Sequence, residues 1–400
     1  MRLSTSMLNE LALRAMLRDQ SELSRTQNQL ATGKSINAPS DDPVAAVQIA
    51  ALTNVNSQSQ QYLRNGQSAT TRLTLQAQAL SDSTTTLQTV RDLVAQANSG
   101  ASSASDRQSF ATQLQALEQQ LQGIANRRDA VGDYLFSGYA AGTQPFTRDA
   151  NGVMKYMGDD GSRQLQVDSG TSVPLGDPGS AIFAGVPTGN GTFTTAAAAG
   201  NTGTGIVDTG SVTDAASWIR DQYTVNFSDA THWTATDSAG NLAGSGTYAP
   251  ATGSSIAFRG IQVGLSGAPA AGDQFTIAPS GHESMFDTLD RVIGTLRNGS
   301  TTSAARAQFA TSMSASLQQI DQSLGRVTQF SATVGSRLTL ISSAAGALDS
   351  QSVTVSTQIS KLGDLDYAKA TALYSQQYLA LQAAQSSYAQ IAQLSLFKYL

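Results

Sequence analysis

Cysteine is absent from the 400-residue chain, and histidine and glutamate are scarce. Without cysteine there can be no disulfide framework, thiol nucleophile or thiolate metal site. The two histidines, His232 and His282, lie far apart in the sequence, which favours surface roles over metal binding. Only four glutamates are present, and GxSxG, HExxH and phosphate-binding glycine motifs are missing. We therefore expect no enzyme, no metal site and no cofactor.

Charged residues and long apolar runs are also limited. Charged side chains make up 13% of the chain and the net charge is −5, which argues against a nucleic-acid partner. The sequence has no run of about 18 apolar residues, so we expect no membrane insertion. The opening MRLSTSMLNELALRAML has scattered polar residues and no uninterrupted apolar core, so we expect no cleaved secretory signal.

Proline and glycine divide the chain into helical ends and a turn-rich middle. No proline occurs in residues 44–144 or after Pro279, whereas 24 of the 35 glycines fall in 137–281. Both ends can therefore form long helices, and we expect these at 43–98, 104–130 and 302–358.

Apolar residues recur at spacings of three, four or seven in the helical ends, which predicts helices that bury a narrow stripe against partner helices. A helix over 43–98 would be roughly 80 Å long, too long for one compact domain, so we predict a rod. Because Gln, Ser, Thr and Ala interrupt the stripes, we expect the arms 1–35 and 365–400 to be marginal or disordered until neighbouring subunits bury them. The predicted assembly residues of the arms are Met16, Leu23, Leu30, Tyr374, Tyr378, Leu381, Tyr388, Ile391, Leu394 and Phe397.

The middle of the chain alternates apolar and polar residues between turn signals, as antiparallel strands do. Residues 153–157 and 163–167 predict a hairpin around Gly158-Asp159-Asp160-Gly161, whose turn would accept positive φ; cation binding by this turn is the alternative. We expect 189–212 to be an exposed loop. Further strands are predicted at 223–227, 233–237 and 255–258.

Four aromatic residues in this middle region leave two interpretations open. Trp218, Tyr223, Phe227 and Trp233 could stack on sugars, which would make the region a secreted glycan-binding module. Their strand spacing favours positions in a β-sheet core.

The stretch GKSINAPSDDPVAA (33–46) places two adjacent aspartates before a proline. Proline is favoured at the first helical position because its missing N–H would be unpaired there. Asp42 can then cap a helix that starts at Pro43, and Asp41 adds negative charge at the same end. A metal ion needs more oxygen ligands than this pair offers, so we interpret it as a helix start.

The same region carries a family resemblance. LATGKSINAPSDDPVAAVQIA (30–50), NRRDAVGDYLFSGYAAGTQPF (126–146) and ALQAAQSSYAQIAQLSLFKYL (380–400) resemble the flagellin family. The similar regions cover roughly 1–150 and 282–400. Within the family, the opening MRLSTSML, the proline after the aspartates and the terminal SLFKYL favour a subunit of the hook–filament junction over flagellin, the filament subunit.

The resemblance implies a multidomain α+β fold and a mechanical role. Residues 1–36 and 364–400 would be inner assembly arms, 37–140 and 282–363 a helical rod domain, and 141–281 an outward-facing β domain. The subunit would form a homo-oligomeric ring between a hook-side hook-associated protein and flagellin, on which the filament grows. It would be exported unfolded through the flagellar type III channel to the extracellular flagellum, with a cytoplasmic chaperone covering its C-terminal stripe.

One stretch of the first rod helix also resembles a flagellin segment recognised by an animal innate immune receptor. In LQTVRDLVAQANSG (87–100), Arg91 is the exposed candidate contact. Leu87, Val90 and Val94 equally fit the buried stripe of a rod helix, so both interpretations remain open.

Overall fold

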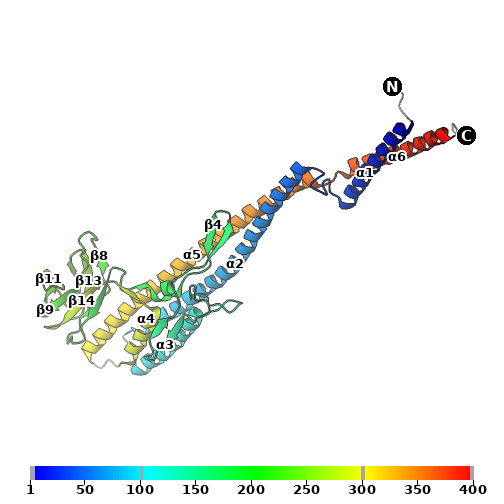
Figure 1. Cartoon of the computed structure of the whole chain (residues 1–400). Helices are drawn as coiled ribbons and strands as arrows, with labels where there is room; N and C mark the ends of the chain where they lie inside the picture. The colour runs from blue at the N-terminus through cyan, green and yellow to red at the C-terminus, as the bar shows by residue number, and fades with distance from the viewer. Residues whose placement is uncertain (1–4, 100–101, 299–301, 397–400) are drawn as a thin grey trace. The chain divides into compact units, whose positions relative to one another are not determined.

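The computed structural model describes residues 5–99, 102–298 and 302–396, without the side chains of 5, 6, 8, 9 and 391–396. The chain has the predicted α+β fold class, with helices from both ends and an antiparallel β domain between them (Figure 1). It divides into two compact units. The first consists of Met1–Arg64 with Ser343–Leu400, and the second is Asn65–Ser342.

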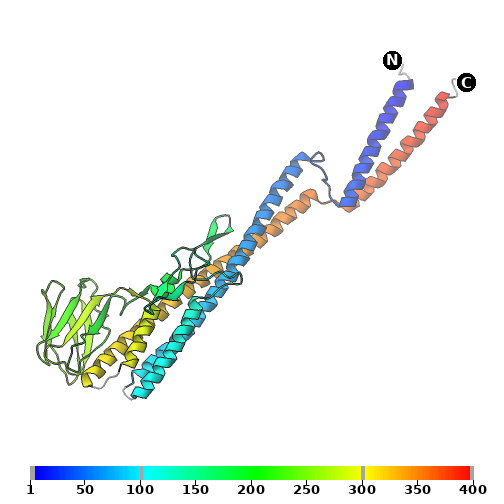
Figure 2. The same ribbon diagram turned by 60° about the horizontal axis from the view of Figure 1, so that its bottom comes forward.

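Four helical segments build the first unit. Helix α1 (Thr5–Thr32) lies beside α6 (Tyr367–Leu396), as Figure 2 shows in blue and red. The other two segments are the start of α2 (Pro43–Ala97) and the end of α5 (Ser303–Gly363). Because each of these long helices contributes to both units, the chain keeps helical structure without interruption where it passes from one unit to the other.

The second unit packs the rest of α2 and α5 with α3 (Ala104–Ala125) and α4 (Met285–Arg297). The seven-residue stripe predicted in α2 is confirmed as core, since Leu73, Leu80, Leu87 and Val94 are all buried. Helix α3 begins with a capping box between Ser103 and Asp106.

Two predicted helix ends differ from the observed ones. Helix α3 ends at Ala125 and not near residue 130, because the side chain of Asn126 hydrogen-bonds both the N–H and the carbonyl oxygen of Phe146. Helix α5 continues past residue 358 to Gly363. No proline or cap in this stretch of the sequence stops it earlier.

The inserted domain consists of two antiparallel sheets with a common apolar core. One sheet has the order β11-β10-β9-β14-β6; the other has the order β12-β13-β7, with β8 also pairing β13. The strands are β6 (Phe193–Ala197), β7 (Ile206–Val207), β8 (Ser211–Val212), β9 (Tyr223–Phe227), β10 (His232–Thr236), β11 (Leu242–Thr247), β12 (Ser254–Phe258), β13 (Ile261–Ser266) and β14 (Gln274–Pro279). Gln319 and Gln308 of α5 donate hydrogen bonds to the carbonyl oxygens of Pro187 and Ala199, both at 3.1 Å, and so fasten this domain to the helices.

Shorter strand pairs connect the sheets to the helices. They are β1 (Phe146–Arg148) with β2 (Met154–Tyr156), β3 (Gln164–Asp168) with β4 (Thr171–Pro174), and β5 (Val186–Pro187) with β15 (His282–Glu283); a short π-helix, η1 (Ser180–Ala184), precedes β5.

The predicted hairpin of 153–157 with 163–167 is wrong in its pairing. Strands form at both places, but β2 pairs with β1 and β3 with β4. The stretch Gly158–Gly161 instead folds against the preceding loop, because the carboxylate of Asp159 accepts hydrogen bonds from the N–H groups of Tyr139 and Ala140. The two aspartates of this stretch do not have a positive φ either. Among the described non-glycine residues, a positive φ occurs at Arg259.

The expectation of an exposed loop over 189–212 is wrong as well. Strand β6 lies inside this segment and pairs with β14 along its whole length. The Phe193 ring is fully buried, and the Thr195 side chain is mostly buried. The small side chains of this segment fit a closely packed edge strand. Because they are only weakly hydrophobic, the sequence pattern did not predict a strand there.

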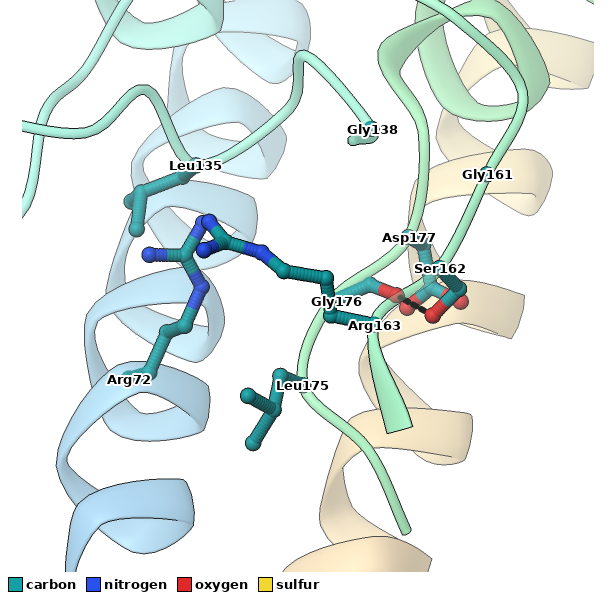
Figure 3. A pocket seen from close by; sticks show the side chains of 9 residues that line it. All are labelled: Arg72, Leu135, Gly138, Gly161, Ser162, Arg163, Leu175, Gly176 and Asp177. Atoms are coloured by element: carbon teal, nitrogen blue, oxygen red, sulfur yellow. Dashed lines mark hydrogen bonds between the residues drawn. The ribbon is translucent and has the colours of Figure 1, made fainter. Parts of the chain in front are cut away.

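A cluster of ion pairs fastens the loops of the second unit to its long helices. Arg337 of α5 holds Asp177 through two hydrogen bonds of 2.8 Å, and Gln76 of α2 donates to the same carboxylate. Figure 3 shows Arg72 of α2 and Arg163 turned toward each other beside Leu135. Burial, and then the positive charge of Arg163, lower the pKa of Arg72, while Asp129 pairs with it.

Removing the buried member of this cluster should destabilise the second unit. We expect R337M to lower its free energy of unfolding by about 3 kcal/mol, because the Asp177 carboxylate, with a side chain 10% exposed, would lose its counter-charge. R91M is the matched control, since Arg91 and Asp321 are 47% and 42% exposed and their loss should cost less than about 1 kcal/mol. Urea denaturation followed by circular dichroism measures both, and equal losses would contradict the expectation.

A buried carboxyl in the same unit should make its stability depend on pH. Glu118 of α3 lies against Arg148, whose guanidinium also pairs with Asp290. Burial and the Asp290 charge raise the pKa of Glu118 to about 7, against the opposing effect of Arg148. The folded chain therefore holds this proton more tightly than the unfolded chain, whose reference value is 4.5, and the resulting stability is lost as pH rises toward 7.

Replacing this carboxyl with an amide removes the titration. Relative to the parent chain, we expect E118Q to gain up to about 3 kcal/mol of stability between pH 4.5 and 8. Chemical denaturation at a series of pH values gives the difference in unfolding free energy. A difference that stays constant over this range would contradict the raised pKa.

Candidate assembly surface

The start of α2 shows what the paired aspartates do. The carboxylate of Asp42 accepts hydrogen bonds from the N–H groups of Val44 and Ala45, at 3.1 and 3.0 Å, and the helix begins at Pro43. Two of the N–H groups left unpaired at a helix start thus gain an acceptor.

Asp41 acts on the preceding turn and not on the helix. Its carboxylate accepts hydrogen bonds from the N–H groups of Ala38 and Asn37, both at 3.0 Å, and these bonds lower its pKa. It also lies 3.2 Å from the guanidinium of Arg25. Within the described ranges, no group of three or more His, Asp or Glu residues is placed to hold a metal ion.

The segments that leave α1 and α5 meet as a short antiparallel ladder. The N–H of Ser35 donates to the carbonyl oxygen of Gly363 at 2.8 Å, and the N–H of Leu365 donates to that of Gly33 at 3.0 Å. Between them, the ammonium of Lys34 pairs with Asp364 at 2.5 Å. We call residues 33–35 with 363–365 the clamp. It brings the first residues of α6 to the end of α1.

Beyond the clamp, α1 and α6 bury few side chains. Leu23, Thr26 and Ala370 are the buried ones among the described side chains of the two helices. The hydroxyl of Thr26 donates to Oε1 of Gln377 at 2.8 Å, and Gln27 donates to the hydroxyl of Tyr374 at 3.2 Å. The contact is therefore narrow and partly polar, and a sparse apolar stripe gives such a contact.

The predicted assembly residues differ in their exposure within one chain. Leu23 is buried, Tyr378 is 53% exposed, and its ring stacks on that of Tyr374. Phe397 and the side chains of Ile391 and Leu394 lie outside the described residues. The half-buried members are Met16, Leu30, Tyr374, Leu381 and Tyr388.

The structure adds exposed apolar side chains to this set. In α1, Leu11, Leu13 and Leu17 are about half exposed, and in α6 Leu379 is 64% exposed. Because they lie off the seven-residue stripe, a search for that spacing alone does not find them. Their side chains nevertheless give both helices apolar surface that the other helix of the pair does not cover.

The first turns of α2 carry a second exposed apolar face. Val44 and Val47 are 69% and 70% exposed. Further along α2, a groove of about 500 Å³ between α2 and α5 is lined by Ala51, Leu52 and Leu362 among others. The spacing of Val44, Val47, Ala51 and Val55 was the available signal for this face.

Two further sequence candidates have definite surroundings in the second unit. Arg91 donates to the carboxylate of Asp321 on α5 at 2.6 Å and remains half exposed, so a receptor contact there stays a prediction. The core interpretation is confirmed for Tyr223, Phe227 and Trp233, which are buried between the two sheets.

The fourth aromatic residue lies at the margin of that core. Trp218 is half buried and packs against the rings of Phe193 and Tyr223. These contacts cover part of the ring surface that a sugar would need for stacking.

Apolar helices of membrane-spanning length are not found in the described part of the chain. The long helices α2 and α5 carry polar residues throughout their sequences and bury only a stripe.

Comparison with known families gives the two helical ends and part of the insert separate matches. Residues 3–141 match the bacterial flagellin N-terminal helical region, and 317–400 match the bacterial flagellin C-terminal helical region. Residues 196–279 match the D2-like domain of flagellar hook-associated protein 1.

Individual relatives carry the name of the junction protein. The chain is 37% identical over 183 residues to flagellar hook-associated protein 3 of Salmonella typhimurium; this match covers 46% of the chain and 57% of that relative. The chain thus spans little more than half the length of the curated relatives it matches.

Solved structures extend the similarity to nearly the whole of a relative. The crystal structure of FlgL from Xanthomonas campestris is 33% identical, with a TM-score of 0.71, over 76% of this chain and 98% of that one. The flagellar junction protein FlgL from Legionella pneumophila is 31% identical, with a TM-score of 0.73, over 79% of this chain and 100% of that one. The chain therefore belongs to the flagellar hook-associated protein 3 family, within the flagellins.

Proposed function

We propose that the chain is a structural subunit of the bacterial flagellum that forms the junction ring between the hook-side hook-associated protein and the flagellin filament. In this role it has no catalytic chemistry, and filament growth starts on the ring. Family membership supports the place in the flagellum. The observation that carries the mechanism is the apolar surface of α1 and α6, which a single chain leaves exposed.

The exposed side chains argue for packing between copies. Leu17 and Leu379, for example, are 58% and 64% exposed although each lies on a helix already paired with another. Burying the exposed part of such side chains favours association by roughly 1–2 kcal/mol each. Polymers whose subunits repeat head to tail gain this contribution at every contact.

The proposed roles divide the chain into assembly arms, a rod domain and a β domain. Residues 1–36 and 364–400 are the inner assembly arms, 37–140 and 282–363 the rod domain, and 141–281 the β domain that faces outward. The β domain has its own core of buried aromatic rings, which supports a separately folded role. A cytoplasmic chaperone would cover the C-terminal stripe before secretion, because an exposed apolar helix invites early association. The chain would then pass unfolded through the type III export channel.

Truncating the C-terminal arm tests the packing mechanism. We expect deletion of residues 389–400, which removes Ile391, Leu394 and Phe397, to abolish incorporation into the flagellum. The β domain should keep its fold, because its core lies in a different unit. Immunoblots of purified flagella and the fluorescence of the two tryptophans, Trp218 and Trp233, in the purified chain measure the two effects. Filaments that incorporate the truncated chain would contradict terminal packing.

Deleting the whole gene tests the junction role. We expect hooks without filaments, seen by electron microscopy, together with flagellin monomer released into the medium, seen by immunoblot. Bare hooks with no flagellin in the medium would instead identify the chain as a filament subunit. Normal filaments would contradict both roles.

A further inference from the structure

We propose that the clamp, and not the interface between α1 and α6, sets the register in which the two arms pair. This inference deepens the assembly role proposed above and rests on it for its biological meaning. The physical claim concerns residues 33–35 and 363–365 within one chain, so it can be tested on the purified protein.

The first argument is that the arm interface specifies register poorly. The stripe of α6 repeats every seven residues, with Ala370, Gln377 and Ala384 on one line. Its second line runs through Tyr374, Leu381 and Tyr388. Sliding α6 by seven residues places Leu381 where Tyr374 lay and Ala384 where Gln377 lay. The slide loses two side-chain hydrogen bonds, Thr26 to Gln377 and Gln27 to Tyr374, and keeps a small or apolar side chain at both places.

The second argument is that contacts concentrate near the clamp. Leu23, Thr26 and Ala370 are buried within the turns next to it, whereas Leu11 and Leu13 further along α1 stay about half exposed. Figure 2 shows the two helices close together where α1 ends and α6 begins, and further apart toward the chain ends. This distribution of contacts indicates pairing that begins at the clamp.

The third argument is that the clamp admits one register. Its two backbone hydrogen bonds, from Ser35 to Gly363 and from Leu365 to Gly33, join particular residues of the two segments. The hydroxyl of Ser35 adds bonds to the carbonyl oxygens of Leu362 and Gly363. A slip of seven residues would break all of these bonds.

Gly33 makes this geometry possible. Its φ of +70° lies in the left-handed region, and a Cβ there would come within 2.9 Å of the Tyr367 hydroxyl. A β-branched residue at this position would be strained by its φ, and a larger side chain would also displace the Tyr367 ring at the start of α6. Gly33 is thus a positioning residue for the arms.

The test uses the absence of cysteine, because every introduced thiol is then unique. Q27C with Y374C reports the observed register, since Nε2 of Gln27 lies 3.2 Å from the Tyr374 hydroxyl and the two positions face each other across the arms. Q27C with L381C reports the register displaced by seven residues. Because both native side chains are long, the thiols are joined by a short bis-maleimide cross-linker and not by a direct disulfide. G33V is placed in the full-length chain with each pair, and the cross-linking yields are compared.

The matched control is G152V, because Gly152 also has a positive φ, of +81°, but nothing lies within 4 Å of a Cβ built there. We expect G33V, and separately S35P, which removes the donor to Gly363, to lower the ratio of observed to displaced cross-link by roughly tenfold. G152V should leave the ratio unchanged. If G33V and S35P both keep the parent ratio, the arm interface sets the register and the proposal is overturned.

A second measurement separates this proposal from the assembly role. The melting temperature of the second unit should be unchanged in G33V, because the clamp lies wholly in the first unit. A loss of register in a purified chain whose gene deletion leaves normal filaments would support the clamp and reject the junction role. An intact register in a strain that lacks filaments on deletion would do the reverse.

Discussion

The narrow apolar stripe on the terminal helices is the constraint on which the rest of this molecule depends. A pair of helices with few buried side chains gains little free energy against the entropy of ordering the chain. Leu23 is the one large apolar side chain that α1 buries among its described residues. Such arms need contacts that align them or further apolar surfaces that cover them. The clamp provides aligning contacts, and the exposed leucines of α1 and α6 provide apolar surface that can be covered.

The second unit is stabilised by contacts of its own. Its long helices bury a full seven-residue stripe of leucine and valine, and α3 and α4 close over it. Ion pairs of low exposure, such as Arg337 with Asp177, then hold the loops between helices and strands in place. Because these contacts belong to one unit, the terminal arms can remain weakly packed while the rest of the chain stays folded. A subunit that must present its arms to other copies benefits from this separation.

The inserted β domain shows why chains with similar helical ends can differ in their middle region. Their core of Tyr223, Phe227, Phe275 and other rings is distinct from the core of the helices. Side-chain amides of α5 are prominent among the links between the two parts. Since a domain with its own core depends little on its neighbours, an insert of this kind can vary without disturbing the helices. The match of residues 196–279 to a domain of a different hook-associated protein agrees with such exchange.

The sequence by itself determined the helices, because apolar spacing and missing prolines act locally. The seven-residue stripe through Leu73 and Leu80, the helix start at Pro43 and the division into helical ends and a β middle all follow from residues close together in the chain. Only the tertiary structure decided which strands pair, because pairing depends on residues distant in sequence. The Asp159 carboxylate accepts a hydrogen bond from the N–H of Tyr139, so its turn packs against the preceding loop and the expected hairpin does not form. The strand that contains Phe193 pairs with β14, more than 80 residues further along the chain. The clamp is also a contact between residues distant in sequence. Nothing near Gly33 in the sequence indicates that Leu365 and Tyr367 lie beside it.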